Sequence, residues 1–403
     1  MRVSTANAYD NTIELLAKRQ AELTAQQERL STGKRVLKPS DDPVAATLAE
    51  TAANRLSRVQ ADLRALESSR TSLQQAESGL AESGELLQRV RELLVTAGNG
   101  SFGDSEREDI ARQLEGLREQ LIGVANLTDN TGRTLFGGLG GAATPFVDTY
   151  GPPASGVLFA GQRGQVAAGN TSLPHALDGD AIWMRIPQGN GSFTISLENA
   201  NTGNVRTDIG EVSDPAALTG AEYEVSFADV GGQMEFTVYD QTNGVTVMSG
   251  IPYAEGQTVN FEGISFQMKG NPADGDRIAV RPATDPTDIF SVVQDVIDAL
   301  RYQGSNQGAH QLQEVSRAMT EVDAGLDRVL LARGRVGEWL NRADSLDSLL
   351  NGRANDYELE KSRLEDLDMI KGISDFQTSQ VALEAALKSY AQVQRLSLFQ
   401  YVG

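Results

Sequence analysis

The sequence contains no cysteine, which excludes disulfide bonds, thiolate metal sites and cysteine nucleophiles. It contains only two histidines, too few for a histidine-rich metal site. Aromatic residues make up 6% of the 403 residues, a proportion that suits helical rods better than a globular catalytic core. No run approaches the roughly 18 apolar residues that a membrane-spanning helix needs. These absences make an enzyme the weakest interpretation.

The charge is strongly acidic, with 35 Lys and Arg against 55 Asp and Glu and a net charge of −20. Such a chain is repelled by phosphate backbones and by anionic lipid, so neither nucleic acid nor a membrane surface is an expected partner. The first twenty residues lack the apolar core of a secretory signal. We therefore expect a protein that stays in the cytoplasm or leaves it without a cleaved signal peptide.

Two long seven-residue repeats of apolar residues lie on opposite sides of the middle of the chain. The first consists of Leu56, Val59, Leu63, Leu66, Leu73, Leu80, Leu87 and Leu94, and the second of Leu312, Val315, Met319, Val322, Leu326, Val329, Val336 and Leu340. Alternating steps of three and four place these residues on one face of a helix, which a lone helix cannot bury. The two distant halves are therefore predicted to pack together as long helices.

Helix boundaries can be assigned from capping signals. Asp42 suits the N-cap and Pro43 the first helical position of a helix that runs to about Ala97. Ser105 and Glu108 have the spacing of a capping box and are predicted to open a third helix. After Pro286 the helical pattern resumes, and a further helical stretch is expected from about residue 355.

The middle of the chain reads as a separate β-rich domain. Nine of the 12 prolines and 21 of the 40 glycines lie in 140–285. Eight short strands are expected there from β-branched and aromatic residues, namely Ile182–Ile186, Phe193–Leu197, Tyr223–Phe227, Glu235–Tyr239, Val245–Met248, Val259–Phe261, Ile264–Met268 and Ile278–Val280. The predicted fold class is α+β and multidomain, with a β-rich domain inserted into a helical bundle or coiled coil.

The two ends of the chain carry short amphipathic segments with little neighbouring sequence to bury them. Their candidate interface residues are Ile13, Leu16, Leu23 and Leu30 at one end and Leu383, Tyr390, Val393, Leu396 and Phe399 at the other. These residues would gain most by packing against other copies or partner helices. A closed monomeric bundle is the alternative.

Two acidic motifs each allow a chemical and a structural interpretation. Asp41 and Asp42 could act as paired carboxylates in acid–base or metal chemistry, but helix capping explains them together with the following proline. The stretch 271–276 resembles a calcium loop without the distal glutamate of an EF-hand, and a turn before a strand is favoured.

Four motifs resemble the flagellin superfamily. LSTGKRVLKPSDDPVAATLA at 30–49 is similar to its N-terminal signature, NLTDNTGRTLFGG at 126–138 to its exit from the N-terminal helices, ARGRVGEWLNRADSL at 332–346 to its C-terminal helix signature, and the final LSLFQYVG to its C-terminus. The signature residues are Pro39, Ser40, Asp41, Asp42, Pro43, Asn341 and Arg342. The proline-flanked aspartates and the final residues are closer to hook–filament junction proteins than to flagellins.

This resemblance implies three layers. Residues 1–45 with 358–403 would form an inner coiled coil, 46–140 with 286–357 a long-helix layer that carries lateral contacts, and 141–285 an outward β domain. The chain would be an extracellular, non-enzymatic structural part of the bacterial flagellum, exported by the flagellar type III apparatus and needing no cofactor.

The resemblance also implies the partners, which are a ring of like subunits, another hook-associated protein on the hook side, flagellin on the filament side and an export chaperone. A bulk filament flagellin is the nearest alternative function. A secreted adhesin whose β domain binds a ligand is a more distant one.

Overall fold

The computed structural model describes residues 2–100, 102–140, 142–149, 156–166 and 173–402, with side chains described between residues 10 and 392 of these ranges. The chain divides into two compact units. The first unit combines Met1–Ala65 with Ser345–Gly403, and the second unit is Leu66–Asp344. The predicted fold class is confirmed, since long terminal helices flank a central antiparallel β region.

The helices are α1 (Arg2–Thr32), α2 (Pro43–Ala97), α3 (Asp104–Ala125), α4 (Gly179–Trp183), α5 (Ile289–Arg301), α6 (Gln307–Glu365) and α7 (Met369–Val402). The predicted start and end of α2 are confirmed. Asp42 caps it, because its Oδ1 accepts the amide of Ala45 at 3.0 Å. None of the helices is long and apolar enough, over the residues described, to cross a membrane.

Two predicted helix boundaries are wrong. The cap of α3 is Gly103, whose amide donates to Glu106 at 3.1 Å, and not the Ser105–Glu108 pair. Glu108 instead forms an ion pair with Arg301 of α5 at 3.0 Å. No break occurs near residue 355, because α6 continues to Glu365 and the chain turns only at 366–368.

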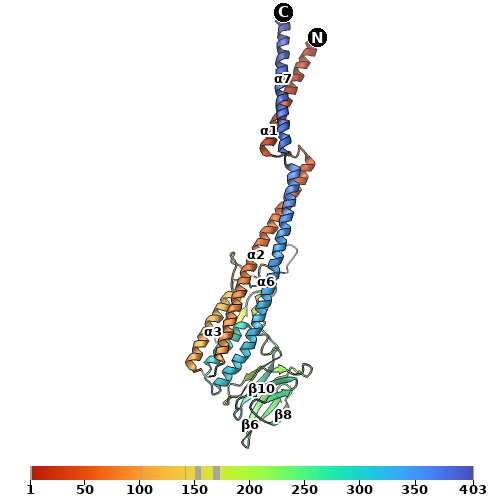
Figure 1. The fold of residues 1–403 in the computed structure, drawn as a ribbon. Coiled ribbons are helices and arrows are strands. Elements are labelled where there is room, and N and C mark those ends of the chain that lie inside the picture. The colour runs from red at the N-terminus through yellow and green to blue at the C-terminus, as the bar shows by residue number, and fades with distance from the viewer. Residues whose placement is uncertain (1, 101, 141, 150–155, 167–172, 403) are drawn as a thin grey trace. The chain divides into compact units, whose positions relative to one another are not determined.

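Within the second unit, α2 and α6 run side by side along the predicted apolar seams (Figure 1). The fully buried seam residues are Leu66, Leu73, Leu80, Leu87 and Leu94 on α2 and Val315, Val322, Val329 and Val336 on α6. Arg333 is the one polar residue in the seam of α6, and it pairs with Glu77 of α2 at 2.7 Å. The seam thus stays closed where it loses its apolar character.

The β strands form three sheets. A two-stranded sheet pairs β1 (Phe146–Asp148) with β2 (Val157–Phe159). A five-stranded sheet has the order β3-β11-β6-β7-β8, with bounds Phe193–Leu197, Arg277–Pro282, Tyr223–Val230, Gln233–Asp240 and Val245–Pro252. In the third sheet, β10 (Ile264–Lys269) pairs with β4 (Arg206–Thr207), β5 (Glu211–Val212) and β9 (Thr258–Phe261). Every pairing is antiparallel.

The two larger sheets share one hydrophobic core. Tyr223 of β6 meets Phe261 of β9 edge to face, with ring centroids 5.0 Å apart. Gln313 of α6 ties this core to the helices, because its Oε1 accepts the amide of Thr207 at 2.8 Å. The amphipathic strands thus bury their aromatic faces against each other.

One predicted strand is wrong and four strands were not predicted. Residues 182–186 contain the end of α4 and a single bridge from Ile186 to Thr287 instead of a strand. An Ile-Trp-Met-Arg-Ile run fits a short buried helix as well as a strand, so composition alone misassigned it. The strands that composition missed are β1, β2, β4 and β5, each of two or three residues.

Candidate assembly interface

In the first unit, α1 and α7 lie side by side (Figure 1). The predicted interface residues Leu16, Leu23 and Leu30 are half-buried on α1, as are Leu383 and Tyr390 on α7. Ile13 is 45% exposed. The side chains of Val393, Leu396 and Phe399 lie outside the described residues. Five of the nine predicted residues are therefore half-buried in the α1–α7 pair, and none of those with described side chains is fully buried.

Incomplete burial is a property of the whole pair. No described side chain of α1 or α7 is buried. A helix in water gains most of its stability from packing of its apolar face. In this pair the apolar faces remain partly in contact with solvent.

A second apolar stripe lies on α7, and its residues are not among the predicted interface residues. It consists of Ile370, Ile373, Val381 and Leu387, which are all exposed; Ile370 is the most exposed, at 85%. At 100° per residue these four positions lie within about a third of the helix circumference, beside the face that carries Leu383 and Tyr390. A search for one seam per helix overlooks such a stripe, whereas a search for two apolar faces finds it.

The two helices are in close contact at Gly372. A Cβ placed on this residue would lie 2.8 Å from Leu367 Cδ2 and 3.2 Å from Leu30 Cδ2. A glycine at this point lets Leu30 of α1 sit against the backbone of α7. Gly372 is the one buried residue in the described part of α7.

Backbone hydrogen bonds fix the base of the pair. The amide of Arg35 donates to the carbonyl of Glu365 at 2.6 Å, and the amide of Leu367 donates to Gly33 at 2.8 Å. Lys34 Nζ adds an ion pair with Glu365 at 2.8 Å, which raises the pKa of the Lys34 ammonium. The chain leaving α1 is thus held to the chain between α6 and α7.

The Pro39–Pro43 signature forms the turn into α2. Asp41 Oδ2 accepts the amides of Leu37 and Lys38, both at 3.1 Å, while Asp42 caps the helix. The backbone hydrogen bonds lower the pKa of both carboxyls, with Arg35 contributing at Asp42. These contacts support the capping interpretation over acid–base chemistry. Pro39, Ser40 and Pro43 are exposed.

The remaining signature residues lie on α6, and the second acidic motif forms a turn. Asn341 and Arg342 are exposed on α6 in the second unit. In the possible calcium loop, Asp276 accepts the amides of Thr202 at 2.8 Å and Ala273 at 2.7 Å, so its carboxylate closes a turn before β11. Among the residues with described positions, no group of three or more His, Cys, Asp or Glu could hold a metal ion.

Comparisons with known proteins give a consistent result. A family model described as the bacterial flagellin N-terminal helical region matches residues 3–140. The flagellar hook-associated protein 3 of Escherichia coli is 26% identical over 99% of both chains. That of Salmonella typhimurium is 28% identical, again over 99% of both chains. The chain resembles flagellar hook-associated protein 3 along its whole length.

Solved structures show the same similarity. The crystal structure of flagellar hook-associated protein 3 from Legionella pneumophila matches with a TM-score of 0.68 and 26% identity, covering 78% of this chain and 98% of that one. A crystal structure of Xanthomonas campestris FlgL matches with a TM-score of 0.66 and 29% identity over the same shares. Flagellins are also similar, such as flagellin A of Vibrio cholerae at 24% identity over 94% of this chain and 93% of its own. These similarities support a structural role in the flagellum.

Proposed function

We propose that this protein is a structural adaptor at the hook–filament junction. It joins a hook-associated protein on the hook side to flagellin on the filament side, through packing of its terminal helices against neighbouring subunits. The full-length similarity to proteins named hook-associated protein 3 supports this assignment over a bulk filament flagellin. The adaptor has no catalytic function and needs no cofactor.

The observation that carries the proposal is the unburied apolar surface of α1 and α7. Ile373, Val381 and Leu387 are 46%, 66% and 50% exposed on α7. Burying one large apolar side chain contributes about 1.5–3 kcal/mol, so covering this stripe in an assembly would offset the entropy of ordering the helices. A helix that is apolar on two faces needs more than one neighbour.

The proposed arrangement assigns a role to each part of the chain. Residues 1–45 with 358–403 pack with neighbouring copies in an inner layer, 46–140 with 286–357 form the next layer, and 141–285 face outward. Like subunits form a ring, and an export chaperone holds the terminal helices before assembly. The protein leaves the cell through the flagellar export apparatus without a cleaved signal.

A strain that lacks the protein tests the proposal. We expect it to keep its hooks and to release flagellin into the medium, and the wild-type gene should restore filaments. Complementation with Val381→Glu should fail, because a charge then occupies the apolar stripe. Ser389→Glu is the matched control, since Ser389 is exposed on a different face of α7 and should still support filaments.

Two results would contradict the proposal. One is a mutant strain that still bears attached filaments. The other is purified protein that polymerises alone into long filaments, which would favour a bulk flagellin. The folding of each variant is checked by far-ultraviolet circular dichroism, because Trp183 and Trp339 both lie in the second unit and do not report on α7.

A further inference from the structure

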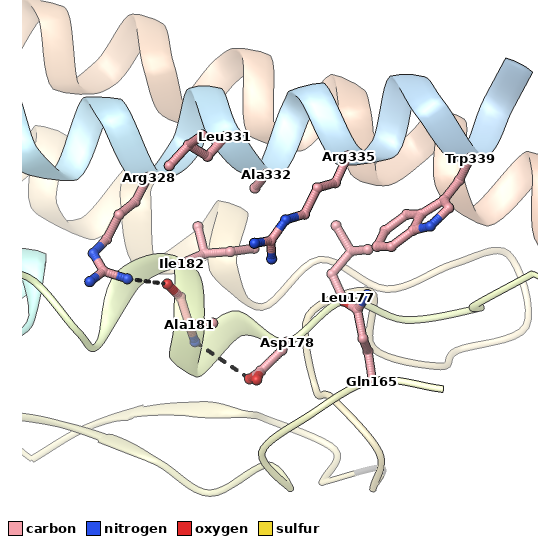
Figure 2. A pocket seen from close by; sticks show the side chains of 10 residues that line it. All are labelled: Gln165, Leu177, Asp178, Ala181, Ile182, Arg328, Leu331, Ala332, Arg335 and Trp339. Carbon is pink, nitrogen blue, oxygen red and sulfur yellow. Dashed lines mark hydrogen bonds between the residues drawn. The ribbon is translucent and has the colours of Figure 1, made fainter. Parts of the chain in front are cut away.

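A hollow of about 170 Å³ lies in the second unit between α6 and the segment that contains α4. Leu331, Ala332 and Trp339 of α6 line one side (Figure 2). Leu177 and Ile182 line the other. The walls are thus mainly apolar, and the space suits one aliphatic side chain. Leu331 at its edge is 66% exposed, so part of this apolar surface faces solvent.

Two arginines lie at the hollow without a carboxylate partner. Arg328 donates to the backbone carbonyl of Ala181 at 3.0 Å, and no ion pair joins Arg328 or Arg335 to any described carboxylate. Burial and the nearby charge of Arg185 lower the pKa of Arg328. Figure 2 shows the guanidinium group of Arg335 extending from α6 toward Ile182. Neither cation therefore forms an ion pair within the described part of the chain.

The acidic residues close to the hollow do not supply that charge. The carboxylate of Asp178 is engaged in local structure, because it accepts the amides of Gly164 at 2.8 Å and Ala181 at 3.4 Å. Asp327 and Glu338 border a shallower neighbouring hollow that shares Leu331 and Arg335. In a chain of net charge −20, unpaired arginines beside an apolar hollow favour an acidic occupant with one apolar anchor.

The chain itself contains such a segment, at the far end of α6. Leu359 is 56% exposed and lies between Glu358 and Glu360. Among the exposed large hydrophobic side chains that the structure describes, it alone has an acidic residue on each side. On a helix these two glutamates project about 100° to either side of the leucine. Arg328 and Arg335 are seven residues apart, about 10 Å along the axis on one face of α6, with Leu331 and Ala332 between them, so a helix that crosses α6 would place one glutamate over each arginine.

We propose that the hollow of one copy binds the Leu359 segment of a second copy, with Leu359 in the hollow and Glu358 and Glu360 against the two guanidinium groups. The contact is heterologous, because it joins two different surfaces of like subunits and so leaves one of each free for further copies. This proposal rests on the proposed function only because it requires that copies of the chain meet in an assembly.

Cross-linking of the purified full chain tests this contact. Because the chain has no cysteine, the introduced thiol is the only one that can react in each variant. Gly334→Cys places a thiol beside the hollow in open space, and Asn355→Cys places one a helical turn from Leu359. With a short bismaleimide, the mixture of the two variants should give cross-linked dimers about tenfold faster than Gly334→Cys mixed with Asn11→Cys. Asn11 is a matched control, since it is also an exposed helical asparagine but lies on α1. Equal rates in the two mixtures would overturn the proposal.

Charge reversal then tests the pairing itself. Adding Arg335→Glu to the Gly334→Cys copy, or Glu360→Arg to the Asn355→Cys copy, should each slow cross-linking about tenfold. Both reversals together should restore most of the rate, because opposite charges again face each other. A loss that the second reversal does not repair would show that these side chains do not meet. The measurement needs no flagellum, so a failed filament-attachment test would leave its outcome unaffected.

Discussion

The α3–α5 pair and the α1–α7 pair are both built from helices far apart in the sequence, but they differ in burial. On α5, Ile289, Phe290, Val293, Val296 and Ile297 are all at most 1% exposed. Arg301 at its end forms ion pairs with Glu108 and Glu115 of α3. In contrast, no described side chain of α1 or α7 is buried.

The difference lies in the number of neighbours and not in the pattern of apolar residues. Helix α5 packs against α3 on one side, and its Ile289 also reaches α6 at Gly325. Among the described residues, the main neighbour of α1 is α7, and that of α7 is α1. The same kind of amphipathic sequence thus gives a finished core in one place and an unfinished interface in the other.

The largest expected contrast is in amide hydrogen exchange. Stability against local opening ranges from about zero in poorly buried segments to the whole free energy of unfolding in a core. We therefore expect α5 amides to exchange at least about a thousandfold more slowly than α1 and α7 amides in the purified chain, a difference of roughly 4 kcal/mol. Mass spectrometry of the labelled peptides measures both regions in one sample.

The intrinsic exchange rates of the peptides provide the control for this comparison. Equal protection of the two pairs would mean that α1 and α7 are stable without neighbours, and would remove the physical basis of the proposed interface. Protection of α1 and α7 should rise in assembled filaments, where neighbours cover the apolar stripe.

Two glycines test how firmly each region is packed. A Cβ would meet Ile289 Cδ1 at Gly325 and Leu367 Cδ2 at Gly372, in both cases at 2.8 Å. Gly325→Ala should lower the free energy of unfolding of the second unit by about 1–3 kcal/mol, because Ile289 is enclosed and cannot move aside. Gly372→Ala should change stability by less than about 1 kcal/mol, since Leu367 is only half-buried and alanine favours helix.

Urea unfolding measures the first of these by tryptophan fluorescence, and far-ultraviolet circular dichroism measures the second. Gly116→Ala on α3 is a suitable control, because no atom lies within 4 Å of its Cβ. This variant should be neutral or slightly stabilised. Equal losses for Gly325→Ala and Gly372→Ala would show that the end pair is as tightly packed as the core.

The sequence predicted the parts of this fold that local chemistry determines. Asp42 and Pro43 specify a helix start by capping, so the beginning of α2 could be assigned to the residue. The end of α6 could not, because Glu365 is followed by a turn whose hydrogen bonds come from Gly33 and Arg35, over 300 residues away in sequence. The Ile182–Ile186 segment failed for a similar reason, since its burial depends on distant aromatic residues such as Phe136.

The sequence identifies candidate interface residues only where they lie on a single apolar face of a helix. Leu16 and Leu383 are half-buried in the α1–α7 pair, and their packing against other copies stays a prediction, whereas the exposed stripe that contains Val381 needed the structure. In a sequence, apolar residues on two faces of a helix resemble those of a fully buried helix. Only the structure, in which no described residue buries the second face of α7, shows that these residues are exposed.

The smallest expected contrast is in the response to pH. Burial raises the pKa of Glu321 in α6, despite the nearby Arg317, so the folded chain binds this proton more tightly than the unfolded chain. Protonation of Glu321 on acidification therefore stabilises the second unit, as protonation of Asp288 and Asp295 does, whereas protonation of His310, whose pKa burial lowers, destabilises it. The pKa of Asp42 is lowered in the folded state. The stability that its ionised carboxylate contributes is therefore present above the ordinary carboxyl pKa, and it is lost as the pH falls through the folded-state pKa.

Two variants separate these effects. Glu321→Gln keeps an acceptor for the amide of Gly189, which lies 2.8 Å from Oε1, and should lower the urea midpoint at pH 5, relative to that at pH 7, compared with the unchanged chain. Asp42→Asn keeps a capping oxygen and should weaken the loss of helix that the first unit shows below about pH 4. A Glu321→Gln variant whose urea midpoint changed between pH 7 and 5 by the same amount as that of the unchanged chain would contradict this account.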